Sequence, residues 1–232
     1  MSEQESESLS EIDLLSELKA AELKKVEKAC SFKRYTAQEQ IIDRQSETTD
    51  VFFVVDGTVR VVNYSLSGRE ITLDDLVAGN FFGELAAIDG APRSASVMAL
   101  NDCLIAAMPQ DQFLQLLEKH PSIALKLMKM LTGIIRTSTN RIMDLSTLAA
   151  NNRVHADLLR MARTHMKDGN EAHISPIPTH SDIASRASTT RETVARVLSD
   201  LSRQGTVERQ KDALVVADVE KLSDMVEEVR GE

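Results

Sequence analysis

Hydrophobic positions change their spacing twice along the chain. Between residues 11 and about 29, apolar residues recur close to helical spacing, which predicts two short helices with a break between them. From about residue 32 to 108, short apolar runs alternate with glycines at near-regular intervals, a pattern typical of a β-barrel or jelly roll. From about residue 109 the helical spacing returns. The pattern therefore predicts an α+β chain, in which a β domain lies between helical segments.

The best-defined strands of the β domain are predicted at residues 51–55, 58–62 and 95–99, where apolar and β-branched side chains predominate. Asp56 and Gly57 separate the first two runs, which predicts a tight hairpin at that point. Several short strands with evenly spaced turns are what a jelly roll requires.

A long helix is predicted from Pro121 to about residue 149, because proline favours the first turn of a helix and nothing interrupts the spacing after it. Asn151 or Asn152 is expected to cap the next helix. Such a long helix projects beyond a small barrel and favours a two-stranded coiled coil in a homodimer; the alternative is a stripe that packs on its own barrel. The stripe consists of Leu131, Ile134, Ser138, Ile142, Leu145 and Ala149.

The predicted organisation has four parts. Residues 1–10 are rich in serine and glutamate, which predicts a disordered N-terminus. Residues 11–120 form the β domain, residues 121–150 the dimerisation helix, and residues 151–232 a second domain. A length of 232 residues accommodates two modest domains.

Charge and cysteine content limit the class of protein. The formal net charge is −9, yet residues 176–211 carry six basic and four acidic side chains, a local balance that suits a phosphate-binding surface. Cys30 and Cys103 are far apart, which argues against a disulfide scaffold and an iron–sulfur cluster and favours a reducing cytoplasm. No apolar run reaches the ~18 residues of a membrane span, and the acidic start is unlike a secretory signal.

Catalytic and metal-binding patterns are missing from the sequence. No serine–histidine–aspartate set, paired carboxylates or metal-ligand spacing forms a coherent site, so we expect neither an enzyme nor a bound metal. Haem is not expected either, because no histidine falls within the span of the predicted barrel. The five histidines are His120, His155, His165, His173 and His180.

The most informative motif occupies residues 81–95, where a glycine, an acid and an arginine surround a turn. Gly83 lets the backbone approach a ligand closely, Glu84 accepts hydrogen bonds from a sugar hydroxyl, and Arg93 offers a planar fork to phosphate oxygens. Ser94 adds a hydroxyl donor, and the helical turn after the acid presents backbone N–H groups to an anion. The alternative is a surface turn in which the acid and the arginine only pair with each other.

This segment resembles the phosphate-binding cassette of cyclic-nucleotide-binding domains, whose pattern is roughly F-G-E-L, a short helix, and P-R-S/A-A. In that family a Thr-Ser pair on the long helix contacts the adenine of cyclic AMP, and Ser138 and Thr139 match it in reversed order. The resemblance implies a cyclic nucleotide effector, with cyclic AMP favoured; cyclic GMP, a cyclic dinucleotide and no effector at all are the alternatives. The implied ligand-binding residues are Leu73, Leu76, Gly83, Glu84, Leu85, Arg93, Ser94, Ala95, Ser138 and Thr139.

A second motif lies at residues 179–204. A short helix over 181–186 and a Ser/Thr turn precede a second helix that begins near Thr190. This is the pattern of a helix-turn-helix, whose second helix enters the major groove of DNA with its first turns on the base edges. The buried stripe of the second helix is predicted at Val194, Val197, Leu198 and Leu201.

The exposed face near the start of the second helix carries Arg191, Glu192 and Arg196. Arginine suits a guanine edge and glutamate the amino group of cytosine; the alternative is a solvated face of Arg–Glu pairs in a helical bundle. The run Thr-Arg-Glu-Thr-Val-Ala-Arg closely resembles the recognition helix of the catabolite activator (CRP/FNR) family, whose base-reading residues match these three. Thr179 and His180 match positions that grip phosphates in the same family.

The resemblance to the CRP/FNR family covers about residues 10–217. It implies a homodimeric transcription regulator with a winged helix-turn-helix, palindromic double-stranded DNA with TGTGA-like half-sites, and RNA polymerase as a further candidate partner. Residues 205–209 and 214–216 resemble its wing, whereas the acidic helix after Asp218 lies beyond the family core and matches no motif. A regulatory subunit of a kinase shares the first motif but does not need the second. The implied DNA-binding residues are Thr179, His180, Thr190, Arg191, Glu192 and Arg196.

Overall fold

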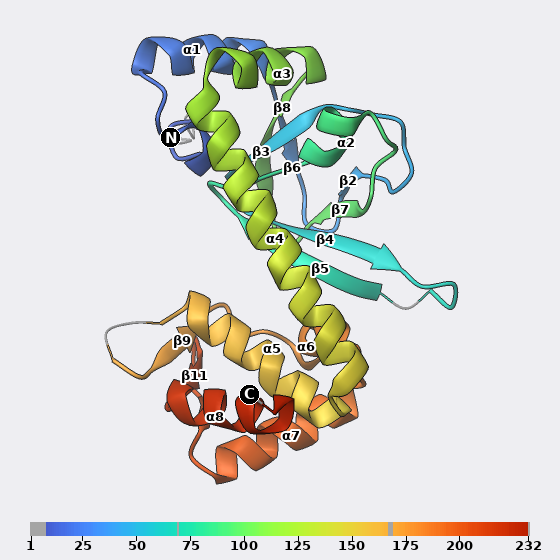
Figure 1. Ribbon diagram of the computed structural model, residues 1–232, viewed down its shortest axis with the longest axis vertical. Helices are drawn as coiled ribbons and strands as arrows, with labels where there is room; N and C mark the ends of the chain where they lie inside the picture. Colours follow the sequence, from blue (N-terminus) through green and yellow to red (C-terminus); the bar gives the residue numbers. More distant parts are fainter. Residues whose placement is uncertain (1–7, 69, 167–168, 232) are drawn as a thin grey trace. The chain divides into compact units, whose positions relative to one another are not determined.

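The computed structural model describes residues 8–68, 70–166 and 169–231 (Figure 1). The chain divides into two compact units, Met1–Gly133 and Ile134–Glu232. Each unit combines helices with antiparallel strands, so the α+β prediction is confirmed.

Most elements of the first unit are short strands. They are η1 (Asp13–Leu15), α1 (Ala20–Ala29), β1 (Ser31–Tyr35), β2 (Gln40–Ile42), β3 (Val51–Asp56), β4 (Thr58–Tyr64), β5 (Glu70–Val77), β6 (Phe81–Phe82), α2 (Glu84–Asp89), β7 (Ser96–Ala99), β8 (Cys103–Met108) and α3 (Gln110–Lys119). The long helix α4 (Pro121–Thr147) runs from the first unit into the second. The second unit continues with α5 (Ala150–Thr164), β9 (Ala172–Ile174), α6 (His180–Arg186), α7 (Arg191–Arg203), β10 (Val207–Arg209), β11 (Leu214–Val216) and α8 (Val219–Arg230).

Two four-stranded antiparallel sheets form the β domain, in the strand orders β1-β8-β3-β6 and β2-β7-β4-β5. A buried cluster between them takes Phe52 and Val54 from the first sheet and Val59 and Val97 from the second. Two antiparallel sheets that bury their inner faces against each other are the architecture of a jelly roll. The predicted jelly roll is therefore confirmed. The predicted hairpin at Asp56 and Gly57 is wrong, because β3 and β4 belong to different sheets and the turn carries the chain from one sheet to the other.

Strand β3 is buried on both faces, which explains its continuous apolar run. Phe52 and Val54 belong to the cluster between the sheets, whereas Val51 and Phe53 belong to a second cluster with residues of η1, α1, α3 and α4. Successive side chains of a strand point to opposite faces. One strand thus links the inside of the barrel to the helices that cover its outer face (Figure 1).

The prediction of a disordered N-terminus at residues 1–10 is wrong in its last part. Residues 1–7 lie outside the described residues. Leu9 is fully buried, and its backbone N–H donates to the Glu27 carboxylate at 3.0 Å. Burial of one leucine side chain contributes about 2 kcal/mol, which helps to order an otherwise polar segment.

The first half of α4 packs on the β domain. The helix begins at a proline, as predicted, and Ile123 and Leu127 are buried in the core of the first unit. Leu131 packs against the same core. The alternative interpretation, a stripe packed on its own barrel, therefore applies to this half. The boundary between the compact units falls inside the helix for the same reason, after Gly133 and not near residue 150.

The second half of α4 presents its apolar stripe to solvent in the single chain. Ile134, Ile142 and Leu145 are 55 %, 62 % and 50 % exposed, and Ile135 is 64 % exposed. Exposed apolar side chains at steps of three and seven residues, as from Ile142 to Leu145 and from Ile135 to Ile142, are typical of a helix–helix interface. The coiled coil with a second copy stays a prediction.

Helices α5, α6 and α7 share one core with a three-stranded antiparallel sheet in the order β10-β11-β9. In α7, Val194, Val197 and Leu201 are buried as predicted, and Leu198 is partly buried. The strands β10 and β11 follow α7 at the predicted position of the wing. The winged helix-turn-helix is therefore confirmed.

Helix α8, the acidic helix without a sequence motif, belongs to the same core. It buries Val219, Leu222 and Val226 and packs along α5. Its charged residues lie on the remaining face, as expected of an amphipathic helix on a domain surface. Within the described ranges, no helix is both long enough and apolar enough to cross a membrane.

The prediction that Asn151 or Asn152 caps the helix after α4 is wrong. Helix α5 begins at Ala150 with an extended Ala149 as its N-cap, so both asparagines lie in its first turn. The Asn151 amide oxygen instead accepts a hydrogen bond from Arg196 at 3.3 Å. The side chain serves a contact between two helices, which the local sequence does not reveal.

Candidate functional site

The turn between β6 and α2 is built around Gly83 and Arg93. Gly83 has a φ of +86°, and a Cβ on it would lie 2.7 Å from Arg93 Nη1 and 2.9 Å from the Asp50 carbonyl oxygen. A side chain would therefore be strained by its backbone and would collide with its neighbours. Only glycine lets the chain close over the guanidinium at this point.

Arg93 is 3 % exposed and is held by three hydrogen bonds. Its Nε donates to Thr48 Oγ1 at 3.0 Å, its Nη1 to the Gly83 carbonyl at 2.8 Å, and its Nη2 to the Asp50 carbonyl at 2.7 Å. A guanidinium has more N–H donors than these bonds use. The fork is thus oriented by the protein, and N–H groups remain that suit an anion.

Two stacked phenylalanines support this arginine. The rings of Phe52 and Phe82 have centroids 5.2 Å apart, and the guanidinium carbon of Arg93 lies 5.5 Å from the Phe52 centroid. Burial lowers the pKa of the Arg93 guanidinium, and the charges of Asp50 and Glu84 oppose that change. Arginine starts so far above neutral pH that the group keeps its charge.

Glu84 opens α2 close to the arginine. Burial raises the pKa of its carboxyl, and a hydrogen bond from its own backbone N–H and the charge of Arg93 offset part of the rise. The three described hydrogen bonds of the guanidinium go to other oxygens, so the arrangement differs from the alternative of a simple Glu84–Arg93 pair. A carboxylate in this position suits a hydroxyl donor.

The residues that flank these groups differ in exposure. Leu85 is 45 % exposed, Ser94 is exposed, and Ala95 is buried. The carbonyl of Ser94 accepts a hydrogen bond from Asn63 Nδ2 at 3.3 Å, which joins the segment to β4. The structure therefore brings the glycine, acid and arginine of the motif together and leaves Leu85 and Ser94 accessible beside them.

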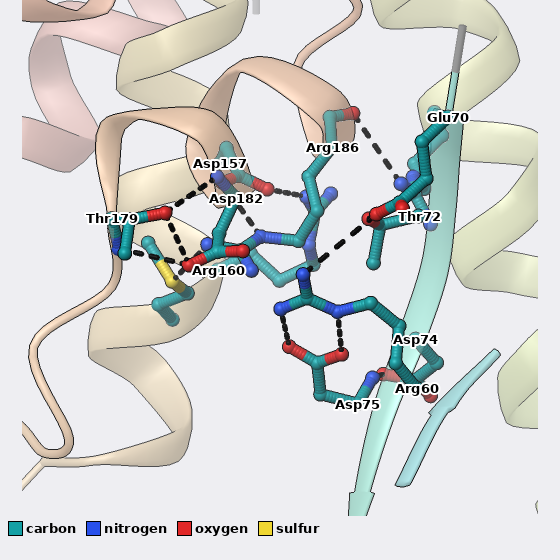
Figure 2. A network of polar contacts seen from close by, with 12 residues as sticks. Arg60, Glu70, Thr72, Asp74, Asp75, Asp157, Arg160, Thr179, Asp182 and Arg186 are labelled. Carbon is teal, nitrogen blue, oxygen red and sulfur yellow. Dashed lines mark hydrogen bonds and ion pairs between the residues drawn. The ribbon is translucent and has the colours of Figure 1, made fainter. Parts of the chain in front are cut away.

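Leu73 and Leu76 lie on β5, where Leu73 is 38 % exposed and Leu76 is partly buried against the barrel core. A bidentate ion pair joins β5 to β4, with Arg60 Nε and Nη2 at 2.7 and 2.8 Å from the two carboxylate oxygens of Asp75 (Figure 2). Paired forks of this kind fix geometry as well as charge. The two leucines thus stand on a firmly joined hairpin.

Ser138 and Thr139 lie on α4, in the second compact unit, and both are exposed in the single chain. The hydroxyl of Thr139 donates to the Ile135 carbonyl at 2.9 Å, the usual bond of a threonine within a helix. Contact of these two residues with a base stays a prediction.

The motif did not reveal the residues that hold the arginine. Thr48 and Asp50 precede Arg93 by 45 and 43 residues, and Phe52 comes from a strand that reads as ordinary barrel core. No local spacing connects them to the motif. The sequence indicates only that a buried arginine needs oxygen acceptors, and it does not indicate which residues supply them.

The helix-turn-helix is capped at both of its helices by threonines. Thr179 Oγ1 accepts from the Asp182 backbone N–H at 3.1 Å, and the Thr179 N–H donates to the Asp182 carboxylate at 2.9 Å (Figure 2). Thr190 Oγ1 accepts from the Thr193 N–H at 3.2 Å. His180, the first residue of α6, is exposed. These caps fix where each helix starts.

Arg191, Glu192 and Arg196 are exposed on the first turns of α7, as predicted. Arg191 Nε donates to Ser181 Oγ at 3.2 Å and Arg196 Nη2 to Asn151 Oδ1 at 3.3 Å. The pKa of Glu192 is lowered, chiefly by its own backbone N–H and then by the hydroxyl of the N-cap threonine. The face therefore presents two cations and a carboxylate, side-chain types whose chemistry suits the edges of guanine and cytosine.

One arginine supports the turn between α6 and α7. Ser188 has a φ of +49°, which is uncommon for a residue other than glycine. Arg153 donates to the carbonyls of Ala187 and Ser188 at 2.9 and 3.0 Å and to that of Leu148 at 2.9 Å. The same side chain thus contacts the turn before the recognition helix and the junction between α4 and α5.

A buried carboxylate attaches α6 to α5. Asp157 is 1 % exposed, accepts a hydrogen bond from Arg186 Nε at 3.1 Å and forms an ion pair with Arg160 (Figure 2). Arg186 is the last residue of α6 and also contacts the sulfur of Met161. The orientation of the first helix of the helix-turn-helix depends on this cluster.

We expect Asp157→Ala to lower the free energy of unfolding of the second unit by about 3 kcal/mol, because it leaves the largely buried charge of Arg186 without its carboxylate. Asp200→Ala is the matched control. Asp200 pairs with Arg203 three residues later, as Asp157 pairs with Arg160, but both side chains of that pair are exposed. The control should cost less than about 1 kcal/mol. Urea denaturation measures both; equal losses would contradict the role assigned to Asp157.

In the part of the chain that the structure describes, the cysteines and potential metal ligands form no further site. Burial raises the pKa of the Cys30 thiol to about 12 and also raises that of Cys103, so neither is a reactive thiolate at neutral pH. Among the described residues, no three histidine, cysteine or carboxylate side chains are placed to hold a metal ion.

Comparisons with known proteins fall on the same two regions. Residues 32–120 match the family model of the cyclic nucleotide-binding domain, and residues 152–225 match that of the Crp-like helix-turn-helix domain. The cAMP-activated global transcriptional regulator Vfr of Pseudomonas aeruginosa is 31 % identical over 196 residues, which cover 81 % of this chain and 89 % of that protein.

Two solved structures have a similar fold. A mutant of CooA from Carboxydothermus hydrogenoformans has a TM-score of 0.74 at 24 % identity, over 86 % of this chain and 88 % of the other. The c-di-GMP responsive global regulator CLP of Xanthomonas campestris has a TM-score of 0.67 at 17 % identity, over 85 % and 99 %. At these identities the likeness supports the fold alone.

Proposed function

Because the chain belongs to the CRP/FNR family of transcription regulators, we propose that it is a homodimer whose binding to palindromic DNA is controlled by a cyclic nucleotide, with cyclic AMP favoured. The observation that carries the proposal is the oriented Arg93 fork over Gly83, in a chain that also exposes the base-reading face of α7. We place the protein in the cytoplasm, whose reducing conditions suit its free cysteines.

The residues of the β domain fit a cyclic nucleotide. The N–H groups of Arg93 that its internal bonds do not use would bind the phosphate, and the Glu84 carboxylate would accept from a ribose hydroxyl. Gly83 keeps the space above the guanidinium clear of a side chain. The further residues that we assign to the ligand are Leu73, Leu76, Leu85, Ser94, Ala95, Ser138 and Thr139.

The choice of effector rests on the phosphate site. An intact Gly83–Glu84 and Arg93–Ser94 pattern favours a mononucleotide over a cyclic dinucleotide. Vfr is named as cAMP-activated and CLP as c-di-GMP responsive, so related folds serve different effectors. Hydroxyls at Ser138 and Thr139 suit either purine, which leaves cyclic GMP as the second candidate.

Control of DNA binding follows from the position of the two hydroxyl residues on α4. A ligand that contacts Ser138 or Thr139 biases how two α4 helices pair, and the change is passed to the recognition helices through the end of α4. Such a ligand shifts a population only if it binds the DNA-competent state better. The two recognition helices must then lie about one DNA turn, roughly 34 Å, apart.

Calorimetric titration with cyclic AMP, cyclic GMP and cyclic di-GMP tests the effector, with a DNA mobility-shift assay in parallel. We expect micromolar binding of cyclic AMP and tighter DNA binding in its presence. If another of these nucleotides binds more tightly, that nucleotide and not cyclic AMP is the effector. Full DNA binding without any nucleotide, and no heat of binding, would overturn nucleotide control.

On the DNA side we propose that Arg191, Glu192 and Arg196 read base edges of a TGTGA-like half-site. Thr179, His180 and Thr190 would contact phosphates. To reach the bases, the two arginines give up their hydrogen bonds to Ser181 and Asn151. This costs little, because both contacts are exposed and water replaces them.

We expect Arg196→Ala to weaken binding to the palindrome by at least about 30-fold, because one bidentate contact to a base contributes roughly 1–3 kcal/mol and a homodimer loses one such contact in each half-site. Nucleotide affinity should stay within about 2-fold, since the residue lies outside the β domain. Arg203→Ala, at the far end of α7, is the matched control and should change DNA affinity little. Fluorescence anisotropy measures both, and an Arg196 variant with full operator affinity would refute the assignment.

A further inference from the structure

Helix α8 reaches past the segment that matches the Crp-like domain, which ends at residue 225. Its start is firmly fixed, since the Asp218 carboxylate accepts from the Lys221 N–H and from Asn170 Nδ2, both at 2.8 Å. Along its length it is held by the buried side chains that it contributes to the core of the second unit. The helix is therefore a stiff element of the domain, attached along α5 (Figure 1).

The last turn of α8 is joined to α4 by a bidentate ion pair. Arg230 Nε lies 3.0 Å from Asp144 Oδ1, and Arg230 Nη2 lies 2.7 and 2.9 Å from the two carboxylate oxygens. The Asp144 side chain is 11 % exposed and the Arg230 side chain 26 % exposed. A sheltered fork of this kind holds distance and orientation together, unlike an exposed ion pair.

The first turn of α8 is joined to the recognition helix. Lys221 Nζ donates to the carbonyl of Gln204, the C-cap residue of α7, at 3.3 Å. A cation at the C-terminal end of a helix is favourable, because the last carbonyls carry partial negative charge. At 1.5 Å per residue, α8 separates Lys221 from Arg230 by about 14 Å along its axis.

We propose that α8 is a strut that fixes the recognition helix α7 relative to the dimerisation helix α4, with Arg230 and Asp144 as its positioning residues. The chain path from α4 to α7 passes through the α4–α5 junction at Leu148 and Ala149, and α8 connects the same two helices without using that junction. The proposal rests on the proposed function in one respect, that α4 joins two copies of the chain.

The strut matters most for DNA that both copies contact at once. Two recognition helices engage a palindrome only if their separation matches the half-site spacing. Once one helix is bound, the second binds with an effective concentration that falls when the geometry becomes loose. Binding to a single half-site involves one recognition helix and does not depend on the separation of the two. Loss of the Arg230–Asp144 pair should therefore weaken full-site binding and spare half-site binding.

The test uses an operator that the wild-type protein selects from a random DNA pool, together with one half of that operator. We expect Arg230→Gln and Asp144→Asn each to lower full-site affinity about 10-fold and half-site affinity by less than about 2-fold. The double variant should be no weaker than either single variant, because both remove the same interaction. Arg230→Lys, which keeps the charge, should recover part of the loss.

Glu228→Gln, a change on the exposed face of the same helix, is the matched control and should leave both affinities unchanged. Thermal unfolding of each variant verifies that the second unit is folded. A folded Arg230→Gln protein with unchanged full-site affinity, or with equal losses on both DNAs, would overturn the strut. A wild-type protein that does not prefer the full site would overturn the dimer and the strut together, and that failure is visible before any variant is made.

Discussion

Arg93→Lys is expected to weaken cyclic-nucleotide binding by at least about 100-fold while the β domain stays folded. Hydrogen bonds to charged groups contribute about 1.5–3 kcal/mol each, and a lysine cannot reproduce a planar fork toward phosphate oxygens. In this protein the fork is also aligned from behind, by Thr48, Gly83 and Asp50. The flexible ammonium group of a lysine is not held in one orientation, and it interacts with the phosphate as a point charge without paired hydrogen bonds.

Calorimetric titration of Arg93→Lys with the effector of the wild-type protein measures the loss. Arg44→Lys is the matched control, because Arg44 is an exposed arginine of the same β domain and should bind nucleotide like wild type. DNA binding by Arg93→Lys should keep the level of nucleotide-free wild-type protein. Wild-type affinity in folded Arg93→Lys would mean that another group binds the phosphate.

Arg93→Ala has a second consequence that lysine partly avoids. It removes the guanidinium donor from the carbonyls of Gly83 and Asp50, of which Gly83 keeps only a longer bond from the Ala87 N–H at 3.4 Å. An unsatisfied buried group costs about 1–3 kcal/mol. The nucleotide affinity of the alanine variant therefore reflects both the lost phosphate contact and a less stable β domain. Lysine is the sharper probe of the phosphate site, and the difference in melting temperature between the two variants measures the structural part.

The parts of the site that the sequence predicts are those whose members lie close together in the chain. Gly83, Glu84 and Arg93 share one turn, and the exposed face of α7 follows from helical spacing alone. The supporting residues are set by tertiary contacts instead. Thr48 reaches Arg93 across 45 residues, and Asp157 reaches Arg186 across 29. No periodicity or capping rule links such pairs.

The errors at the N-terminus and at the start of α5 have the same origin. Leu9 is one apolar residue in a polar segment, and its burial depends on a cluster formed by η1, α1 and β3. The asparagines after α4 have the right chemistry for a cap, yet the helix starts earlier and one of them contacts Arg196. Local propensity supplies candidates in both cases, and the contacts of the folded domain decide between them.

Ile142→Asp is expected to convert the protein to a monomer and to abolish preferential binding to the full palindrome. Ile142 and Ile135 lie one heptad apart on α4 and are 62 % and 64 % exposed in the single chain. In a two-fold interface each side chain is buried twice, once in each copy. At about 1.5–3 kcal/mol for each buried isoleucine, removal of both copies of Ile142 costs roughly 3–6 kcal/mol.

This cost raises the dissociation constant of the dimer at least about 100-fold, before the repulsion of two facing carboxylates is counted. Sedimentation equilibrium measures the change directly. Met143→Asp is the matched control, because Met143 is 55 % exposed but points about 100° away around the helix. A dimer that survives Ile142→Asp and dissociates with Met143→Asp would place the interface on the other face of α4.

The same variant separates effector binding from dimer formation. The cradle of Gly83, Glu84 and Arg93 lies wholly within the β domain, so an Ile142→Asp monomer should still bind the nucleotide phosphate. Residues on α4 that contact a base across the dimer would be lost to the site. We therefore expect weaker but measurable nucleotide binding, with loss of the discrimination between cyclic AMP and cyclic GMP. Unchanged discrimination in the monomer would remove Ser138 and Thr139 of the second copy from the site.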